Sequence, residues 1–287
     1  MLFDDHPPPF DLEGYLARID YHGPRRPTLD VLQAIHLAHV QHIPFENLDV
    51  LLGKPVLLDR ASLHAKLIAG KRGGYCFEQN LTLADALETL GFSVTRLAAR
   101  VRLGGHHITA RTHMLLRVDV DGQPYLADVG FGSQGLLVPV PMSPGNVSQQ
   151  FLWNYRLVAE GDLLVLQIES PTGWFDMYAF TQEQQHLVDY QVANLFIFAH
   201  PDSPFVRTLT VQRPTPEGRY SLRGLDFVID RGSTRVPRTL VNEYEILEVL
   251  NRYFGLHFPA GTRFRSQVDR LQQFLFGPTT TSSSEVT

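Results

Sequence analysis

Cysteine is almost absent from this sequence: its 287 residues include one, Cys76. A single cysteine excludes a disulfide within the chain and suits a reducing compartment. Apolar runs approaching the roughly 20 residues of a membrane-spanning helix are absent as well. The first residues carry two aspartates and three prolines instead of the basic and then apolar pattern of a secretory signal. We therefore expect a cytoplasmic protein without a membrane segment.

Positive charge is not in excess either. The chain has 25 Lys and Arg residues against 30 Asp and Glu residues, a formal net charge of −5. Proteins that bind nucleic acids or anionic membranes ordinarily present a basic surface, so we expect neither partner. The composition, 44% hydrophobic and 19% charged, is typical of a globular protein with a sizeable core.

The segment around Cys76 has the pattern of a nucleophile. Gly73 and Gly74 precede the cysteine, and a helical pattern over 77–90 ends at Gly91. The sulfur then lies at a helix N-terminus, where unpaired backbone N–H groups favour the thiolate. A lone cysteine is more often a small buried hydrophobic residue, and this segment alone leaves both interpretations open.

A thiolate nucleophile needs a base and a group that orients the base. His113 and Asp128 lie in two predicted strands that a tight turn at Asp121-Gly122 joins, so the strands are expected to pair. Asp128 stands among apolar residues, where a carboxylate is costly unless a cation such as an imidazolium pairs with it. We predict a catalytic triad of Cys76, His113 and Asp128.

Other histidines offer weaker alternatives. His106 and His107 are rival bases in a loop, which holds side chains less firmly than a strand does. His36, His39 and His42 recur at every third residue, but no carboxylate or thiol joins them at a recognised metal-ligand spacing. We interpret these three as helix-surface or core residues and predict no metal.

The hydrophobic periodicity predicts an α+β fold in three parts. Residues 1–90 are expected to form a helical bundle carrying Cys76, and residues 91–205 an antiparallel β-barrel carrying His113 and Asp128. Residues 206–287 are expected to form an α/β lid with a disordered Ser/Thr-rich tail from 278. The active site would then lie in the cleft between bundle and barrel.

Particular segments are assigned as follows. Glu46 and Asn47 are interpreted as polar groups that tie a loop to its neighbours. A short helix over 181–187 precedes a loop over 194–204. The remaining predicted helices cover 11–19, a segment after Thr28, 61–68 and 241–254. The predicted strands cover 92–103, 112–120, 124–128, 136–140, 151–158, 163–169, 174–180, 207–212, 220–225 and 227–229.

Together these features resemble the arylamine N-acetyltransferase family. The matching pieces are Arg72-Gly73-Gly74-Tyr75-Cys76-Phe77-Glu78-Gln79-Asn80, a histidine 37 positions on (113 − 76) and an aspartate 15 further (128 − 113). Segments 43–48 and 200–205 match two more signatures of the family. The likeness spans most of the chain and weakens after about residue 210.

The resemblance implies a core like that of cysteine proteases and transglutaminases, and an enzyme of xenobiotic metabolism. Its donor would be acetyl-coenzyme A, and its acceptors arylamines, arylhydrazines and hydrazides, reached through an acetyl-cysteine intermediate without a metal. The acceptor pocket would contain Phe45, Val101, Phe131 and Phe205. The coenzyme A contacts would be Thr109 and Gly132, with Arg102, Arg111 and Lys71 as neighbouring cations.

Three alternatives remain. The order Cys, His, Asp also occurs in thiol hydrolases and transglutaminase-like enzymes, which would need a groove for a polypeptide. An amide synthase that uses a carrier-bound thioester would share every motif named above. A binding protein with a vestigial site is disfavoured, because decay would ordinarily have removed at least one residue of the triad.

Overall fold

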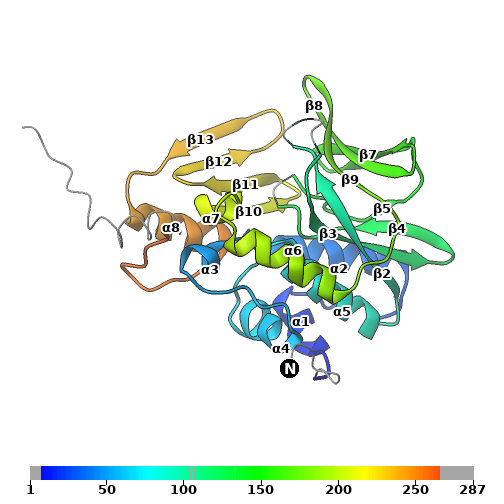
Figure 1. Cartoon of the computed structure of the whole chain (residues 1–287), viewed down its shortest axis with the longest axis horizontal. Helices are drawn as coiled ribbons and strands as arrows, with labels where there is room; N and C mark the ends of the chain where they lie inside the picture. Colours follow the sequence, from blue (N-terminus) through cyan, green and yellow to red (C-terminus); the bar gives the residue numbers. More distant parts are fainter. Residues whose placement is uncertain (1–7, 104, 106–107, 133, 266–287) are drawn as a thin grey trace, which may run out of the picture.

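The computed structural model describes residues 8–103, 105, 108–132 and 134–265. His106, His107 and the tail from 278 lie outside these residues, so the predictions about them stay predictions. Helices lie beneath two sheets, with the barrel strands in green and the C-terminal strands in yellow and orange (Figure 1). The predicted α+β class is confirmed, whereas the domain boundaries at residues 90 and 205 stay predictions.

The first part of the chain is helical apart from one short strand. Its elements are α1 (Leu12–Arg18), α2 (Leu29–His42), β1 (Phe45–Glu46), α3 (Leu48–Leu51), α4 (Arg60–Leu63), the π-helix His64–Ala69 and α5 (Cys76–Thr89). Asp11 and Asp59 cap α1 and α4 by accepting hydrogen bonds from the N–H groups of Gly14 and Ser62. The predicted helix over 61–68 therefore exists, but its second half has π-helical hydrogen bonding.

The middle of the chain forms an eight-stranded antiparallel sheet that curls into a nearly closed barrel. Its strand order is β5-β4-β3-β2-β9-β8-β7-β6. Asp121 and Gly122 both have positive φ, 50° and 76°, as the tight turn between β3 and β4 requires. The strands are β2 (Ser93–Val101), β3 (Arg111–Val120), β4 (Gln123–Ala127), β5 (Val140–Pro141), β6 (Val147–Gln150), β7 (Trp153–Glu160), β8 (Leu163–Ser170) and β9 (Gly173–Phe180).

The last part of the chain contributes a second sheet, of order β1-β10-β11-β12-β13. Its elements are α6 (Leu187–Ala199), α7 (Pro204–Arg207), β10 (Thr210–Thr215), β11 (Gly218–Arg223), β12 (Asp226–Asp230), β13 (Arg235–Thr239) and α8 (Glu243–Phe254). Gly255 ends α8 in the left-handed conformation, φ 67°.

Several predicted elements are wrong. The helix predicted over 181–187 begins only at Leu187, and it continues through the first part of the predicted loop over 194–204. Of the strand predicted over 136–140, only Val140 is in a strand, because the pairing of β5 with β4 begins at that residue. Strands β1, β6 and β13 were not predicted, since none of them shows a long apolar alternation.

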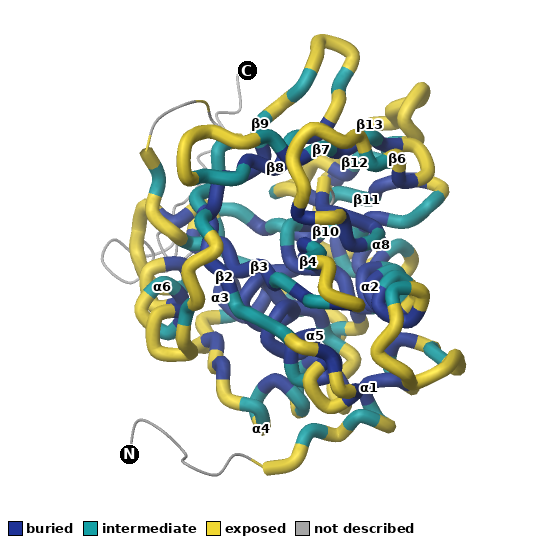
Figure 2. The backbone as a smooth tube through the Cα atoms, turned by 90° about the vertical axis from the view of Figure 1, so that its right-hand side faces the viewer, coloured by how far each residue is buried: buried dark blue, intermediate teal, exposed yellow. Residues whose placement is uncertain are grey.

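The nucleophile helix lies in the largest apolar cluster. This cluster combines buried side chains of α1, α2 and α5 with those of the barrel, and α5 packs against β2 and β3. Figure 2 shows α5 as a mostly buried tube close to β2 and β3. A second cluster joins Leu48 and Leu51 of α3 to the C-terminal sheet and α8. The N-terminal segment is therefore part of both cores.

Candidate active site

Cys76 is the first residue of α5, so the helix begins one residue before the predicted start at 77, and the sulfur lies at the helix N-terminus as predicted. The Glu78 carboxylate accepts a hydrogen bond from the backbone N–H of Tyr75 at 3.0 Å, which satisfies one donor at this helix end. The cysteine is 5% exposed, and its Sγ lies 3.6 Å from the Thr112 carbonyl oxygen on β3. The sulfur is thus placed directly beside the strand that carries His113.

Gly73 and Gly74 are required by close packing, not by an unusual backbone conformation. Neither residue has a positive φ. A Cβ atom on Gly73 would lie 2.0 Å from the Pro44 carbonyl oxygen, and one on Gly74 would lie 2.6 Å from Glu78 Oε2. The two glycines therefore let the backbone before the cysteine approach β1 and the Glu78 side chain.

His113 and Asp128 are brought together by the pairing of β3 with β4. His113 Nε2 and Asp128 Oδ2 are 2.7 Å apart, and both side chains are buried. Because Asp128 contacts Nε2, the other ring nitrogen of His113, Nδ1, is not held by Asp128. The prediction that the two residues lie side by side is confirmed.

Burial and charge oppose each other in this pair. Burial lowers the pKa of His113, but the charge and hydrogen bond of Asp128, together with the neighbouring Cys76, outweigh burial and raise the pKa to about 10. For Asp128, burial raises the pKa, yet His113 and the hydrogen bonds from Asn80 and Gly130 leave it below its ordinary value. The structure therefore favours an imidazolium paired with a carboxylate at neutral pH.

Asn80 is a residue of this site to which the sequence analysis assigned no role. Its Nδ2 donates to Asp128 Oδ1 at 3.0 Å and to the Met114 carbonyl at 2.8 Å, and its Oδ1 accepts from the Val129 N–H at 3.1 Å. Asn80 stands four residues after Cys76 and so faces the same side of α5. That spacing is the signal that would have identified it.

Gly130 and His36 fix the segment after Asp128. A Cβ atom on Gly130 would lie 2.5 Å from Cys76 Cα, so the loop and the nucleophile helix meet at backbone distance. His36 accepts from the Asp128 N–H through Nε2 at 3.1 Å, and its Nδ1 lies 3.0 Å from the Leu137 carbonyl oxygen. His36 is thus a buried neutral imidazole that binds both ends of the segment 128–137.

Aromatic rings surround the site in two groups. The Phe131 and Tyr178 rings lie 5.1 and 4.8 Å from the His113 ring, and Val101 pairs with Tyr178 across β2 and β9. At the start of α5, the Phe205 ring stacks on Tyr75 at 5.8 Å and lies 5.6 Å from Phe45. The four predicted pocket residues therefore fall in two clusters, one at the base and one at the nucleophile helix.

The residues predicted to contact coenzyme A have partners within the protein. Thr109 Oγ1 donates to the Val101 carbonyl at 2.9 Å, and Gly132, at φ 85°, packs against the Gln212 side chain. Arg102 pairs with Glu160 and Asp176. Arg111 lies 2.9 Å from Glu183.

A buried ionic cluster lies below the start of α5. We name it the Lys66 cluster, and its members are Glu46, Asp49, Lys66, Arg72 and Glu78. Lys66 Nζ lies 2.7 Å from Glu78 Oε1, and Arg72 lies 2.7 Å from Glu46. Burial raises the pKa of Glu78 to about 7 even though Lys66 opposes the shift.

Glu46 and Asn47 have the tying role that the sequence predicts. Asn47 Nδ2 donates to the carbonyls of Phe205 and Thr208 at 2.7 and 2.8 Å, and its Oδ1 accepts from the Thr210 N–H at 2.8 Å. Glu46 accepts hydrogen bonds from the Arg72 side chain and the Leu48 N–H.

In the ranges that the structure describes, no three His, Cys, Asp or Glu side chains are grouped as metal ligands would be. No helix within the same part of the chain combines the length and the apolar character needed to cross a membrane.

Comparisons with known proteins agree with this geometry. Residues 28–262 match the sequence model of a family described as N-acetyltransferase. The arylamine N-acetyltransferase of Mycolicibacterium smegmatis is 41% identical over 252 residues, which cover 86% of this chain and 92% of that protein. The arylamine N-acetyltransferase of Escherichia coli K12 is 38% identical over 248 residues, covering 85% and 88%.

Solved structures of similar sequence have the same fold. The arylamine N-acetyltransferase of Mycobacterium marinum in complex with CoA superposes with a TM-score of 0.82 at 39% identity. The match covers 85% of this chain and 92% of that one.

Proposed function

Since this chain belongs to the arylamine N-acetyltransferase family, we propose that it moves an acetyl group from acetyl-coenzyme A to the nitrogen of arylamines, arylhydrazines and hydrazides. The observation that carries the proposal is the buried His113–Asp128 pair, 2.7 Å apart, beside a cysteine at a helix N-terminus. A relative crystallised in complex with CoA supports the choice of donor.

The first half of the reaction loads Cys76. The nitrogen of His113 that Asp128 does not hold carries the proton taken from the Cys76 thiol, so the site holds a thiolate beside an imidazolium, and Asp128 stabilises that imidazolium. The thiolate attacks the acetyl carbonyl, a new S–C bond forms, and the bond from that carbon to the sulfur of coenzyme A breaks. The departing sulfur takes the proton from His113 and leaves as the free thiol.

The second half transfers the acetyl group to the acceptor. The amine nitrogen attacks the acetyl-Cys76 carbonyl, the N–C bond forms and the C–S bond breaks. His113 accepts the proton of the amine and Cys76 leaves as the thiolate, so the thiolate and the imidazolium of the starting enzyme are restored. The two halves follow one another in a ping-pong sequence.

Acceptor choice follows from basicity and from the aromatic residues. An arylamine is neutral and nucleophilic at neutral pH, whereas an alkyl ammonium ion must first lose a proton. Phe131 on the His113 side, and Phe45 and Phe205 on the Tyr75 side, offer faces for a flat ring. The free thiol that this chemistry requires suits the reducing cytoplasm.

Intact mass tests the proposal. Wild-type protein mixed with acetyl-coenzyme A alone should gain one acetyl group, and an added arylamine or hydrazide should discharge it. Cys76→Ala should gain none, and Asp128→Asn should load at least about 10³-fold more slowly, because its histidine loses both orientation and charge stabilisation. Wild-type protein with a reactive thiol but no acetyl adduct would favour a thiol hydrolase or a carrier-dependent amide synthase instead.

A further inference from the structure

Tyr178 is a buried residue of the active site to which the reaction above assigns no part. It lies on β9 and is fully buried, and its ring lies 4.8 Å from the His113 ring and 5.1 Å from the Phe131 ring. Among the described residues, its hydroxyl has no hydrogen-bond partner of standard geometry. Buried hydroxyl groups are ordinarily paired, because an unpaired one has lost its hydrogen bonds to water. An unpaired hydroxyl beside the triad therefore needs an explanation.

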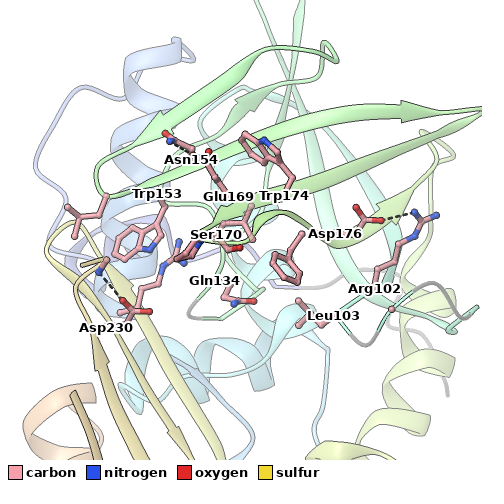
Figure 3. A pocket seen from close by; sticks show the side chains of 17 residues that line it. Arg102, Leu103, Gln134, Trp153, Asn154, Glu169, Ser170, Trp174, Asp176 and Asp230 are labelled. Atoms are coloured by element: carbon pink, nitrogen blue, oxygen red, sulfur yellow. Dashed lines mark hydrogen bonds and ion pairs between the residues drawn. The ribbon is translucent and has the colours of Figure 1, made fainter. Parts of the chain in front are cut away.

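The largest cavity near this strand does not supply the partner. A cavity of about 940 Å³ is lined by Trp174, Phe175 and Asp176 of β9, and Figure 3 shows Trp174 and Asp176 around it. Tyr178, two residues further along the strand, does not occur among the described residues that line this cavity. Since its hydroxyl is also shielded from solvent, a partner has to come from the protein itself.

Asp128 can accept one more hydrogen bond. Its Oδ1 accepts from Asn80 at 3.0 Å and from the Gly130 N–H at 2.9 Å, whereas among the described residues Oδ2 accepts from His113 alone. A carboxylate oxygen has two lone pairs, so Oδ2 has room for a second donor. Burial, and then the charge and acceptor oxygen of Asp128, raise the pKa of Tyr178 well above its usual value. The Tyr178 hydroxyl is thus a neutral donor beside an acceptor position that is not filled.

The charge that faces Asp128 changes during the proposed reaction. In the free enzyme the His113 imidazolium compensates the carboxylate. Once His113 has given its proton to the departing coenzyme A, the buried carboxylate faces a neutral imidazole. A buried carboxylate without a cation is costly unless further hydrogen bonds reach it. The need for a second donor at Oδ2 is therefore greatest in the acetyl-enzyme.

The other titratable groups around Asp128 are committed elsewhere. His36 packs from α2, and because burial lowers its pKa to about 4 it is neutral and accepts from the Asp128 N–H. Tyr155, on β7, already donates to the Gly135 carbonyl at 2.7 Å. Cys76, on α5, carries the acetyl group at this stage. Of the titratable side chains described around this carboxylate, Tyr178 remains.

We propose that Tyr178 is a positioning residue for the second half of the reaction: its hydroxyl donates to Asp128 in the acetyl-enzyme and so keeps His113 neutral, ready to accept the proton of the amine. In the free enzyme the imidazolium compensates the carboxylate, which agrees with the unpaired hydroxyl. This role rests on the proposed function, whereas the hydrogen bond requires only that His113 lose its charge. Without the hydroxyl, Asp128 favours the imidazolium more strongly, so His113 keeps its proton to higher pH.

Tyr178→Phe removes the hydroxyl and keeps the ring. Rapid-quench intact mass follows both loading by acetyl-coenzyme A and discharge by an arylamine. Loading should stay within about 3-fold of the wild type, because that half uses the imidazolium. Discharge at neutral pH should be about 10-fold slower, as for loss of one hydrogen bond to a charged group, and the two proteins should converge as the pH rises.

Tyr15→Phe is the matched control, because it removes a buried hydroxyl that lies 2.9 Å from His39 and outside the triad. It should leave both rates and their pH profiles as in the wild type. Loading slowed as much as discharge in Tyr178→Phe, or a discharge profile with an unchanged inflection, would overturn the proposal.

Alkylation of Cys76 by iodoacetamide tests the hydrogen bond without acetyl transfer, because it also removes the thiolate. NMR titration of His113, assigned with His113→Gln, should show a proton affinity about 10-fold higher in alkylated Tyr178→Phe than in the alkylated wild type. Equal proton affinities would refute the role of Tyr178 even where both proteins load acetyl. A wild type that fails to load acetyl while this difference persists would instead refute the proposed function.

Discussion

At the scale of single residues, Gly130 packs directly against the backbone of the nucleophile helix. A Cβ atom there would meet Cys76 Cα at 2.5 Å and Asn80 Nδ2 at 2.7 Å. Cys76 Cα is backbone, and the Asn80 amide is held by hydrogen bonds to the Met114 carbonyl and to Asp128, so Gly130→Ala must move the loop or the helix. We expect a loss of about 1–3 kcal/mol in unfolding free energy and at least about a 100-fold fall in the rate of acetyl loading.

Gly122→Ala is the control that separates the loss of unfolding free energy from the fall in the rate of acetyl loading. Gly122 has φ 76° in an open turn with nothing near its Cβ position, so alanine adds backbone strain of about 1 kcal/mol without touching the site. Urea unfolding and single-turnover loading should show a stability loss alone. Equal loading rates in Gly130→Ala and wild type would contradict the backbone contact.

His36 should make stability depend on pH. Burial lowers its pKa to about 4 from 6.5, so the unfolded chain binds a proton more readily than the folded protein does. The stability from neutral His36 is complete above pH 6.5 and is lost as the pH falls toward 4. Between about pH 7 and pH 5 this amounts to about 2 kcal/mol of unfolding free energy.

His36→Gln should reduce the slope of unfolding free energy against pH. A glutamine amide can donate to the Leu137 carbonyl and accept from the Asp128 N–H without titrating. Urea unfolding at the two pH values measures it. Buried His39, whose pKa burial lowers to about 3, should keep part of the slope. His22→Gln, on an exposed side chain, is the control, and an unchanged slope in His36→Gln would refute this role.

At the scale of elements, the start of α5 depends on the Lys66 cluster. Lys66 contacts both Asp49 and Glu78, and Glu78 in turn accepts from the Tyr75 N–H next to Cys76. Lys66→Met leaves these carboxylates without that cation, so we expect a loss of about 3–5 kcal/mol in unfolding free energy.

Adding Glu78→Gln to Lys66→Met should recover about 1–3 kcal/mol relative to the sum of the two single changes, since the uncompensated charge is gone. Urea unfolding of all three variants measures the coupling. Arg25→Met, at the exposed pair with Glu13, should leave the unfolding free energy close to that of the wild type, because solvent screens the pair. Strict additivity at Lys66 and Glu78 would show that the pair does not hold the helix start.

The elements differ in how far their sequences predict them. Strand β3 and helix α8 are predictable, because β3 alternates and α8 has an Asn242 cap and a Gly255 end. Helix α6 is obscured by its run of β-favouring aromatic and branched residues after Asn194, and tertiary packing overrides that local preference. Strand β13 is exposed at every residue, so it lacks any apolar alternation.

The residues of the active site also differ in how far the sequence predicts them. Cys76, His113 and Asp128 are predictable because a helix start and a tight hairpin are local features. Tyr178 is not, because its position beside His113 depends on the pairing of β2 with β9, which are distant in sequence. The clash at Gly130 likewise arises only when the barrel docks on α5.

At the scale of the whole molecule, Asn47 joins the N-terminal and C-terminal parts. Its side chain makes three hydrogen bonds to the backbone of residues 205, 208 and 210, and it is 1% exposed. Asn47→Ala leaves two carbonyls and one N–H without that partner, so we expect a loss of about 2–4 kcal/mol. Hydrogen exchange should accelerate from α7 into β10.

Asn251→Ala, on an exposed position of α8, serves as the control and should stay within about 0.5 kcal/mol of wild type. Exchange that accelerates evenly over the whole protein in Asn47→Ala, instead of first at α7 and β10, would contradict a local tie.

The pairing of strand β1 also determines when, during synthesis on the ribosome, the surroundings of Cys76 can form. Phe45 pairs with Gln212, 167 positions later (212 − 45), and the Glu46 N–H donates to the Gly74 carbonyl just before Cys76. Contacts so distant in sequence form late in folding. In a nascent chain that ends before β10, the loop before Cys76 can contact only a β1 that still lacks its partner strand, β10. The reactive thiol therefore acquires its final surroundings only after β10 has been synthesised.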